Sequence, residues 1–215
     1  MGRPRIPNKE TRITPKHVQI IRATYQVLAE KGLSRFSLQD VADRLNVSKG
    51  VVLYYFRNKD GLLLATWRWV LSRVAERIRT SVERSATPED RVRAMVDAIF
   101  IGPEANRTFY LTFLDLVGSV ARDPAFAALA EEARRIEEET YADVIRHGAR
   151  SGIFRSSDPI QDAKVLRALI DGLFIQWLQE REWRELHPLY KRLCEEAILR
   201  YLRSPSNGHV SDTDG

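Results

Sequence analysis

A short segment near the N-terminus carries residue types that suit contact with double-stranded DNA. Residues 49–56 read KGVVLYYF, and helical spacing turns Val52, Tyr55 and Phe56 toward one face. The opposite face then presents a cation, a bare backbone patch, two apolar groups and a phenol, from Lys49, Gly50, Val51, Leu53 and Tyr54. In the major groove a lysine reaches guanine edges or phosphates, and apolar groups meet thymine methyls. The segment therefore predicts a helix that reads a DNA groove.

The residues before this segment predict that it is the second helix of a helix-turn-helix spanning residues 37–56. Ser37 is typical of a helix N-cap, and Asp40 stands at the third helical position. Val41 and Ala42 fall on the inner face of a first helix over residues 38–45. Asn46 stands where the turn needs a left-handed residue, for which asparagine is suited. The alternative is a structural three-helix unit with no role in DNA binding.

The rest of the chain predicts an all-α fold. Threonine or aspartate followed by proline precedes several apolar-periodic runs, a pattern typical of capped helix starts. No segment shows sustained alternation of apolar and polar residues, so no sheet is expected. The expected helices, about nine, cover residues 15–31, 38–45, 49–56, 59–84, 88–101, 104–121, 124–150, 159–182 and 188–203. The run EARRIEEE is interpreted as a solvated helix face with internal ion pairs.

The charge distribution separates the chain into a basic head and a slightly acidic body. Residues 1–60 carry a net charge of +7, whereas the remaining 155 residues carry −2. A basic end on a nearly neutral scaffold is typical of proteins that bind a polyanion, although a solvated charged surface gives the same numbers. We expect a basic arm over residues 1–13 and a disordered tail over 204–215. Arg3 and Arg5 in the arm suit a narrow minor groove, and the alternative is a disordered leader.

The motifs of residues 14–74 resemble the DNA-binding domain of the TetR family. They include IIRATYQVLAEKG, SLQDVA, VSKG and YYFRNKDGLL, of which the last is the most diagnostic. The resemblance implies DNA contacts from Ser37, Gln39, Ser48, Lys49, Gly50, Val51, Tyr54, Tyr55 and Lys59. Many members of the family have tyrosine where this chain has Leu53, so a contact is expected to be absent there. The segments GVVLYYF and RALIDGLFIQWL are similar to the corresponding segments of the subgroup that includes betaine-pathway repressors.

The same resemblance implies that residues 75–203 form a domain that binds a small molecule and dimerises. Aromatic and apolar side chains that could line its pocket are Trp67, Phe100, Phe109, Tyr110, Phe113, Tyr141 and Ile145. For each of these residues the alternative is plain core packing. Asp115 is a carboxylate inside an apolar run, which needs an arginine partner, a cationic ligand or exposure to water. A cation held among aromatic rings is the ligand that this residue would favour.

The last two helices are expected to form a four-helix bundle across a twofold axis. The interface residues predicted from their apolar stripes are Leu166, Ile170, Leu173, Trp177, Leu193 and Ile198. Gly172 leaves room for close helix approach. Packing within a single chain is the alternative for both helices.

No motif for catalysis or cofactor binding is found. The chain lacks a P-loop, G-x-S-x-G and H-E-x-x-H, and its four histidines have no neighbour at metal-ligand spacing. Cys194 with His187 is an imaginable nucleophilic pair, but a buried structural cysteine is preferred. No stretch of eighteen uncharged apolar residues is found, and the basic N-terminus lacks the apolar region of a signal peptide. The single cysteine suits the reducing cytoplasm.

The sequence therefore predicts a cytoplasmic homodimer without a cofactor that binds a palindromic operator. It is expected to be a repressor, associated with the nucleoid when bound to DNA and released by a small lipophilic ligand. Two alternatives remain open. The first is an activator with the same DNA-binding domain, and the second is a protein of this fold whose body binds a protein partner.

Overall fold

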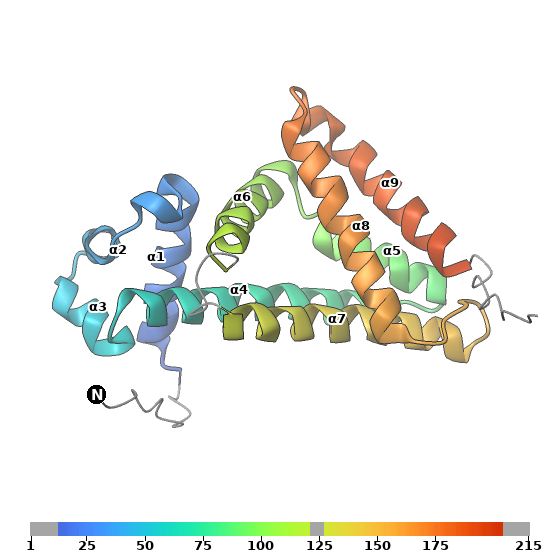
Figure 1. Ribbon diagram of the computed structural model, residues 1–215, viewed down its shortest axis with the longest axis horizontal. Coiled ribbons are helices and arrows are strands. Elements are labelled where there is room, and N and C mark those ends of the chain that lie inside the picture. Colours follow the sequence, from blue (N-terminus) through green and yellow to red (C-terminus); the bar gives the residue numbers. More distant parts are fainter. Residues whose placement is uncertain (1–12, 121–126, 204–215) are drawn as a thin grey trace, which may run out of the picture. The chain divides into compact units, whose positions relative to one another are not determined.

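The computed structural model describes residues 13–120 and 127–203, and every regular element within them is a helix. The helices are α1 (Pro15–Lys31), α2 (Leu38–Leu45), α3 (Lys49–Phe56), α4 (Lys59–Val82), α5 (Pro88–Ile99), α6 (Pro103–Val120), α7 (Ala127–Arg150), α8 (Pro159–Gln179) and α9 (Trp183–Arg203), with a 3-10 turn, η1 (Leu33–Arg35). Figure 1 shows them in chain order. The predicted all-α class is confirmed. The predicted arm and tail lie outside the described residues.

Side-chain caps begin three helices as the sequence predicted. Thr14 accepts a hydrogen bond from the His17 backbone N–H, and Thr87 accepts one from the Asp90 N–H. Asp158 accepts two, from the backbone N–H groups of Ile160 and Gln161. These bonds satisfy donors that the first helical turn leaves without partners.

The ninth helix begins before the predicted residue 188. Pro188 lies inside α9, which starts at Trp183. The Trp183 ring packs edge-on against Trp177 at 5.8 Å, and its backbone carbonyl accepts a hydrogen bond from the Trp177 indole N–H at 2.5 Å. These tertiary contacts fix the start of the helix upstream of the proline, which the local sequence signal did not reveal.

The chain divides into two compact units between Thr66 and Trp67, before the boundary predicted near residue 74. The division falls within α4. From Trp67 onward this helix belongs to the second unit, where Arg68 Nε donates to Glu132 Oε2 at 2.6 Å and Ser81 Oγ donates to the Ala94 carbonyl at 2.9 Å. Because Arg68 precedes residue 74 and already bonds to a residue of the second unit, the predicted boundary is too late.

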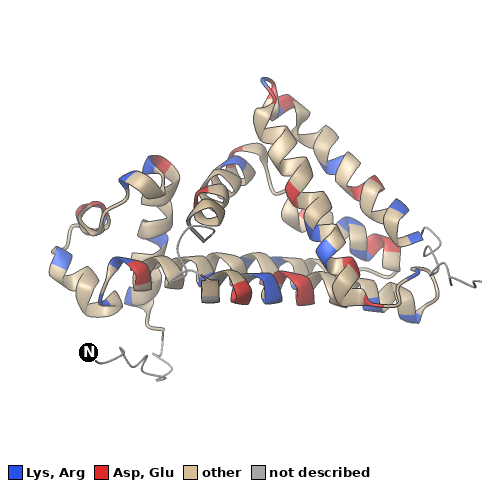
Figure 2. Ribbon diagram, in the orientation of Figure 1, with Lys and Arg blue, Asp and Glu red and all other residues tan. Residues whose placement is uncertain are grey.

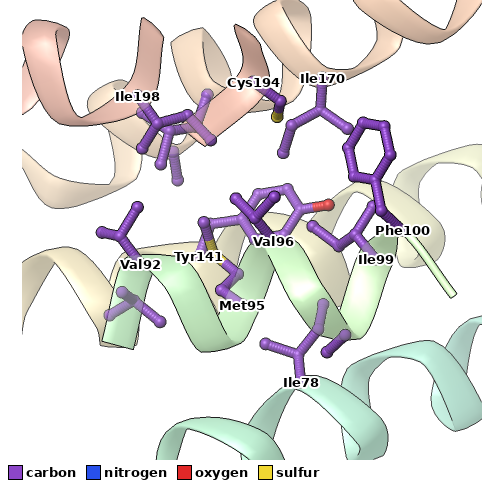
Figure 3. Packing of buried hydrophobic residues seen from close by; sticks show 14 of the residues in the cluster. Ile78, Val92, Met95, Val96, Ile99, Phe100, Tyr141, Ile170, Cys194 and Ile198 are labelled. Carbon is purple, nitrogen blue, oxygen red and sulfur yellow. The ribbon is translucent and has the colours of Figure 1, made fainter. Parts of the chain in front are cut away.

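The second unit has one continuous apolar core. Helices α5, α7, α8 and α9 contribute most of its buried side chains, and α4 adds Ile78. Figure 3 shows residues of α5 and α8, among them Met95, Val96 and Ile170, pointing into a common interior with Tyr141 of α7. Bands of acidic and of basic residues lie along α7 (Figure 2).

Candidate nucleic-acid interface and effector site

The helix-turn-helix geometry is set by local capping. Ser37 Oγ accepts from the Asp40 N–H at 3.3 Å, while the Ser37 N–H donates to the Asp40 carboxylate at 3.0 Å. Lys31 Nζ lies 2.6 Å from the same carboxylate and holds the pKa of Asp40 below its ordinary value. Asn46 adopts the predicted left-handed conformation, with φ 52° and ψ 47°, and ends α2. These contacts fix the angle at which α3 leaves the turn.

The outer face of α3 is accessible, as the sequence predicted. Lys49 and Gly50 are exposed, and Tyr54 is 81% exposed, a large fraction for an aromatic residue. Val51 and Leu53 are half-buried, whereas Val52 is fully buried beneath them. A Cβ atom at Gly50 would meet only Ser48 Oγ, at 3.6 Å, so the backbone there is open to close approach. The helix therefore presents a cation, a phenol and an uncovered backbone on one surface.

The flanking residues assigned by resemblance have different surroundings. Ser37, Gln39 and Ser48 are exposed, and the Gln39 amide donates to Asp43 Oδ1 at 2.7 Å. Tyr55 is half-buried, and its ring packs edge-on against His17 at 4.9 Å and Tyr54 at 5.2 Å. Tyr55 therefore helps to orient Tyr54, whether or not it also reaches DNA.

Lys59 has an intramolecular role that the sequence did not reveal. Its Nζ donates to the Phe36 carbonyl at 2.8 Å and lies 5.2 Å from the centroid of the Phe36 ring. The ammonium therefore ties the start of α4 to the segment before α2. The phosphate contact predicted for Lys59 stays a prediction, and a Lys59 variant would also alter the fold.

Most of the aromatic residues predicted for the pocket gather inside the second unit. Tyr110 stacks on Phe174 at 4.0 Å, and Phe174 stacks on Phe100 at 4.3 Å. Phe109 and Phe113 pack edge-on against Tyr110, at 5.2 and 5.9 Å. Tyr141 and Ile145 are buried in the same core cluster, which does not include Trp67 among its members. Phe174 belongs to this ring cluster although the prediction omitted it.

The carboxylate predicted for the interior is in the wrong place. Asp115 is exposed on α6, whereas Tyr110 of the same helix is buried. Two other acids of the second unit are partly buried: Glu137 of α7 is 16% exposed and Asp171 of α8 is 29% exposed. Burial raises the pKa of both carboxyl groups, that of Glu137 to about 7, although Arg167 opposes the shift. The sequence analysis did not select Glu137, because this residue lies in the charged run EARRIEEE, which was interpreted as a solvated helix face.

Comparison with known proteins decides the family. Residues 88–203 match the family described as BetI-type transcriptional repressor, C-terminal, and residues 20–66 match the bacterial regulatory proteins of the tetR family. The chain belongs to the TetR family, with a BetI-type C-terminal domain. A relative from Paraburkholderia phymatum, described as HTH-type transcriptional regulator BetI, is 32% identical over 175 residues, covering 80% of this chain and 84% of its own. Its counterpart from Burkholderia thailandensis is 33% identical over 163 residues, covering 75% of this chain and 80% of its own.

Solved structures share the fold of this TetR-family regulator. A TetR transcription regulator from Haloarcula marismortui has a TM-score of 0.74 at 23% identity, covering 88% of this chain and 97% of its own. A transcriptional regulator from Saccharomonospora viridis in complex with choline has a TM-score of 0.76 at 24% identity, covering 88% and 98%. These structures confirm the fold, while the matches to the two sequence families and to the curated relatives confirm the predicted family, the DNA-binding class and the non-enzymatic character.

The part of this regulator that the structure describes contains no group of three histidine, cysteine or acidic residues that could hold a metal ion. Within the same residues, no helix combines the length and apolarity that crossing a membrane requires. Burial raises the pKa of the Cys194 thiol to about 12, so the nucleophilic thiolate is disfavoured.

Four of the six residues predicted for the dimer interface are in the wrong place. Leu166, Ile170, Trp177 and Ile198 are at most 1% exposed within a single chain, so they cannot contact a second copy. Leu173 is half-buried and packs against the same core. Leu193 is 40% exposed and remains available. The apolar stripes of α8 and α9 mainly build the core of one regulator chain.

A different face of α8 and α9 is apolar and exposed. On α8, Gly172 and Ile175 lie near each other on the outer surface, and a Cβ atom at Gly172 would meet nothing within 4 Å. On α9, Leu189 and Leu193 are exposed one turn apart. Of the residues that the sequence analysis selected for the interface, Leu193 lies on this outer face, and helical periodicity separates the face from the buried stripe of Leu166, Ile170, Trp177 and Ile198.

Proposed function

We propose that this regulator is a homodimeric repressor that a small organic cation releases from its operator. The observation that carries the DNA-binding part is the accessible α3 surface of Lys49, Gly50 and Tyr54. A helix that leaves these groups outward has the chemistry for guanine edges, thymine methyls and phosphates. Since such a protein must reach the chromosome, we place it in the cytoplasm.

The dimer is proposed to form through the outer face of α8 and α9. Exposed apolar side chains in a cluster favour association, and Gly172 allows a second helix to come close. A symmetric pair of readers is also needed, because one short helix rarely supplies enough affinity for a specific site. The interface would centre on Gly172, Ile175, Leu189 and Leu193.

The effector is proposed to be a quaternary ammonium compound such as choline. Choline is bound by the structural relative from Saccharomonospora viridis, and the second unit of this chain has stacked rings with acidic groups nearby. Aromatic faces and carboxylates together attract a cation that has no hydrogen-bond donors on its nitrogen. The ligand must favour the form that does not bind DNA, typically by about 1–3 kcal/mol.

The experiment is a titration of an operator duplex with the full-length protein, with and without choline. Choline should weaken operator binding about 5- to 150-fold, and operator should weaken choline binding by the same factor. If choline binds equally well with and without operator, it is not an inducer. Operator binding that choline does not change would exclude this effector.

A protein partner is the second candidate effector. Leu111 and Val117 on α6 are nearly half exposed, as an apolar docking surface would require. Replacing both with serine should leave choline release unchanged if the effector is the small cation. Loss of regulation in cells, with choline release intact in the test tube, would favour the protein partner.

A further inference from the structure

Three charged groups of α7 and α8 meet in the second unit, where these two helices pack together. Arg167 Nε lies 3.0 Å from Glu137 Oε2 and 3.5 Å from Asp171 Oδ2. All three side chains are less than a third exposed. Two carboxylates therefore share one guanidinium, so the cluster carries a net charge of −1 when every group is ionised. A net charge in a poorly solvated site is costly unless a proton or another cation offsets it.

The hydrogen bonding of this acidic cluster is incomplete. Glu137 Oε2 is buried, yet within the described residues no donor reaches it with hydrogen-bond geometry, since Arg167 contacts it only as an ion pair. Asp171 Oδ1 accepts a hydrogen bond from the Tyr110 hydroxyl, with a long O···O distance of 3.4 Å. Leaving a buried acceptor without a donor costs about 1–3 kcal/mol, which natural structures usually avoid. Glu137 therefore keeps acceptor capacity that the described residues do not use.

Aromatic rings adjoin the same acids. Tyr110, which contacts Asp171, is stacked on Phe174 at 4.0 Å and meets Phe113 at 5.9 Å. Tyr141 stands one helical turn after Glu137 on α7 and is buried in the same core. Ring faces attract cations by their quadrupole, and the attraction grows where water is excluded. The acids and rings thus supply the two components of a cation site.

We propose that Glu137 and Asp171 form the cation subsite of the effector site, and that the bound cation replaces a proton held by Glu137. This inference rests on the proposed function, which it deepens by naming the residues and the exchange. The ligand class is a small organic cation such as a quaternary ammonium. Arg167 stays in place as the fixed countercharge of the second carboxylate.

The proton balance follows from the surroundings of Glu137. Burial raises its pKa to about 7, so near neutral pH the carboxyl group is partly protonated. A cation beside it favours the carboxylate, and the displaced proton leaves to solvent. The other titratable groups that face the cluster are Tyr110, Tyr141 and Cys194, from α6, α7 and α9, together with Glu138 of α7. Burial raises the pKa of both tyrosines and of the thiol, so these three stay neutral through the relevant range.

The test is calorimetric titration of the full-length protein with choline chloride at pH 6, 7 and 8. At pH 6 two buffers with different ionisation enthalpies report the number of protons released. We expect close to one proton per choline at pH 6 and almost none at pH 8. Affinity should rise about tenfold between these two pH values, because below the pKa each pH unit changes it about tenfold. The neutral carbon isostere of choline, 3,3-dimethyl-1-butanol, should bind without releasing a proton.

Two variants test whether the proton released on choline binding comes from Glu137. Glu137→Gln should abolish proton release and weaken choline binding at pH 8 at least tenfold, whereas Asp115→Asn, which alters the exposed acid of α6, should change neither. Choline binding without proton release in the wild-type protein would overturn the inference and leave the proposed function intact. Because that readout needs no variant, misfolding of Glu137→Gln would not prevent the test. Failure of choline to bind at any pH would overturn both.

Discussion

Lys49 and Tyr54 are exposed side chains of α3, and Tyr54 packs edge-on against Tyr55 while 81% of it stays exposed. Ser37 caps α2 and Tyr55 packs on His17, so those residues combine a place in the fold with any contact to DNA. Lys59 likewise has a partner in the Phe36 carbonyl. The DNA-binding role can therefore be isolated best at Lys49 and Tyr54.

Replacing Lys49 or Tyr54 with alanine should weaken operator binding while leaving folding and dimerisation unchanged. Lys49→Ala should cost about 1–3 kcal/mol if the ammonium contacts a guanine. Fluorescence anisotropy with a labelled operator measures the effect, and Arg84→Ala, an exposed cation of the second unit, is the charge-matched control. Equal losses in Arg84→Ala and Lys49→Ala would mean that only overall charge matters.

Local residue signals were predictable, but buried charges were not. Asn46 in its left-handed conformation and the Ser37 cap depend on neighbours within a few residues, so the sequence contains their cause. The burial of Glu137 depends on Arg167, which lies 30 positions further along the chain, and on how α7 packs against α8. Nothing within the run EARRIEEE distinguishes Glu137 from its solvated neighbours.

At the scale of elements, helix existence was predicted better than helix orientation. The bounds of α1, α2 and α3 agree with the sequence analysis because caps and turn residues determine them. The orientation of α8 was wrong because both of its faces contain apolar residues. Leu166 and Ile170 face the core, while Gly172 and Ile175 lie on the other side. Only the positions of α7 and α9 decide which stripe is buried.

Two glycines in helices should respond oppositely to alanine. A Cβ atom at Gly148 would lie 2.0 Å from the buried Phe154 ring, so Gly148→Ala should destabilise the fold by about 1–3 kcal/mol. Gly172 has open space, so Gly172→Ala should stabilise it by up to about 1 kcal/mol through helix propensity. Urea denaturation at low protein concentration measures both effects. A stable Gly148→Ala variant would contradict the packing of Phe154 onto α7.

Gly172 also tests the dimer interface. Gly172→Leu should leave the fold of the single chain intact but block close approach of a second α8, giving monomers. Sedimentation velocity at micromolar concentration measures this, with Thr80→Leu at an exposed position of α4 as the control. A native dimer after Gly172→Leu would place the interface elsewhere. The core residue Leu166 would be a poor probe, because its replacement would first destabilise the single chain.

At the scale of the whole molecule, the charge distribution separates two tasks. The first 60 residues carry +7, which suits a polyanion, and the remainder carries −2. Association with DNA should therefore weaken steeply with salt, as counterions return to the phosphates. The side chains of the acidic cluster in the second unit are less than a third exposed, so salt should affect choline binding less than it affects DNA binding.

Selection of binding sites from random DNA duplexes by the full-length protein tests most directly whether this regulator reads an operator as a dimer. A homodimer with one α3 helix per chain should select an inverted repeat whose half-site centres lie one helical turn apart, about 10–10.5 base pairs, or a multiple of it. Selection with Lys49→Ala should lose or relax the preference within each half-site. Enrichment of no sequence, or of an asymmetric single site that Lys49→Ala selects equally well, would contradict this prediction.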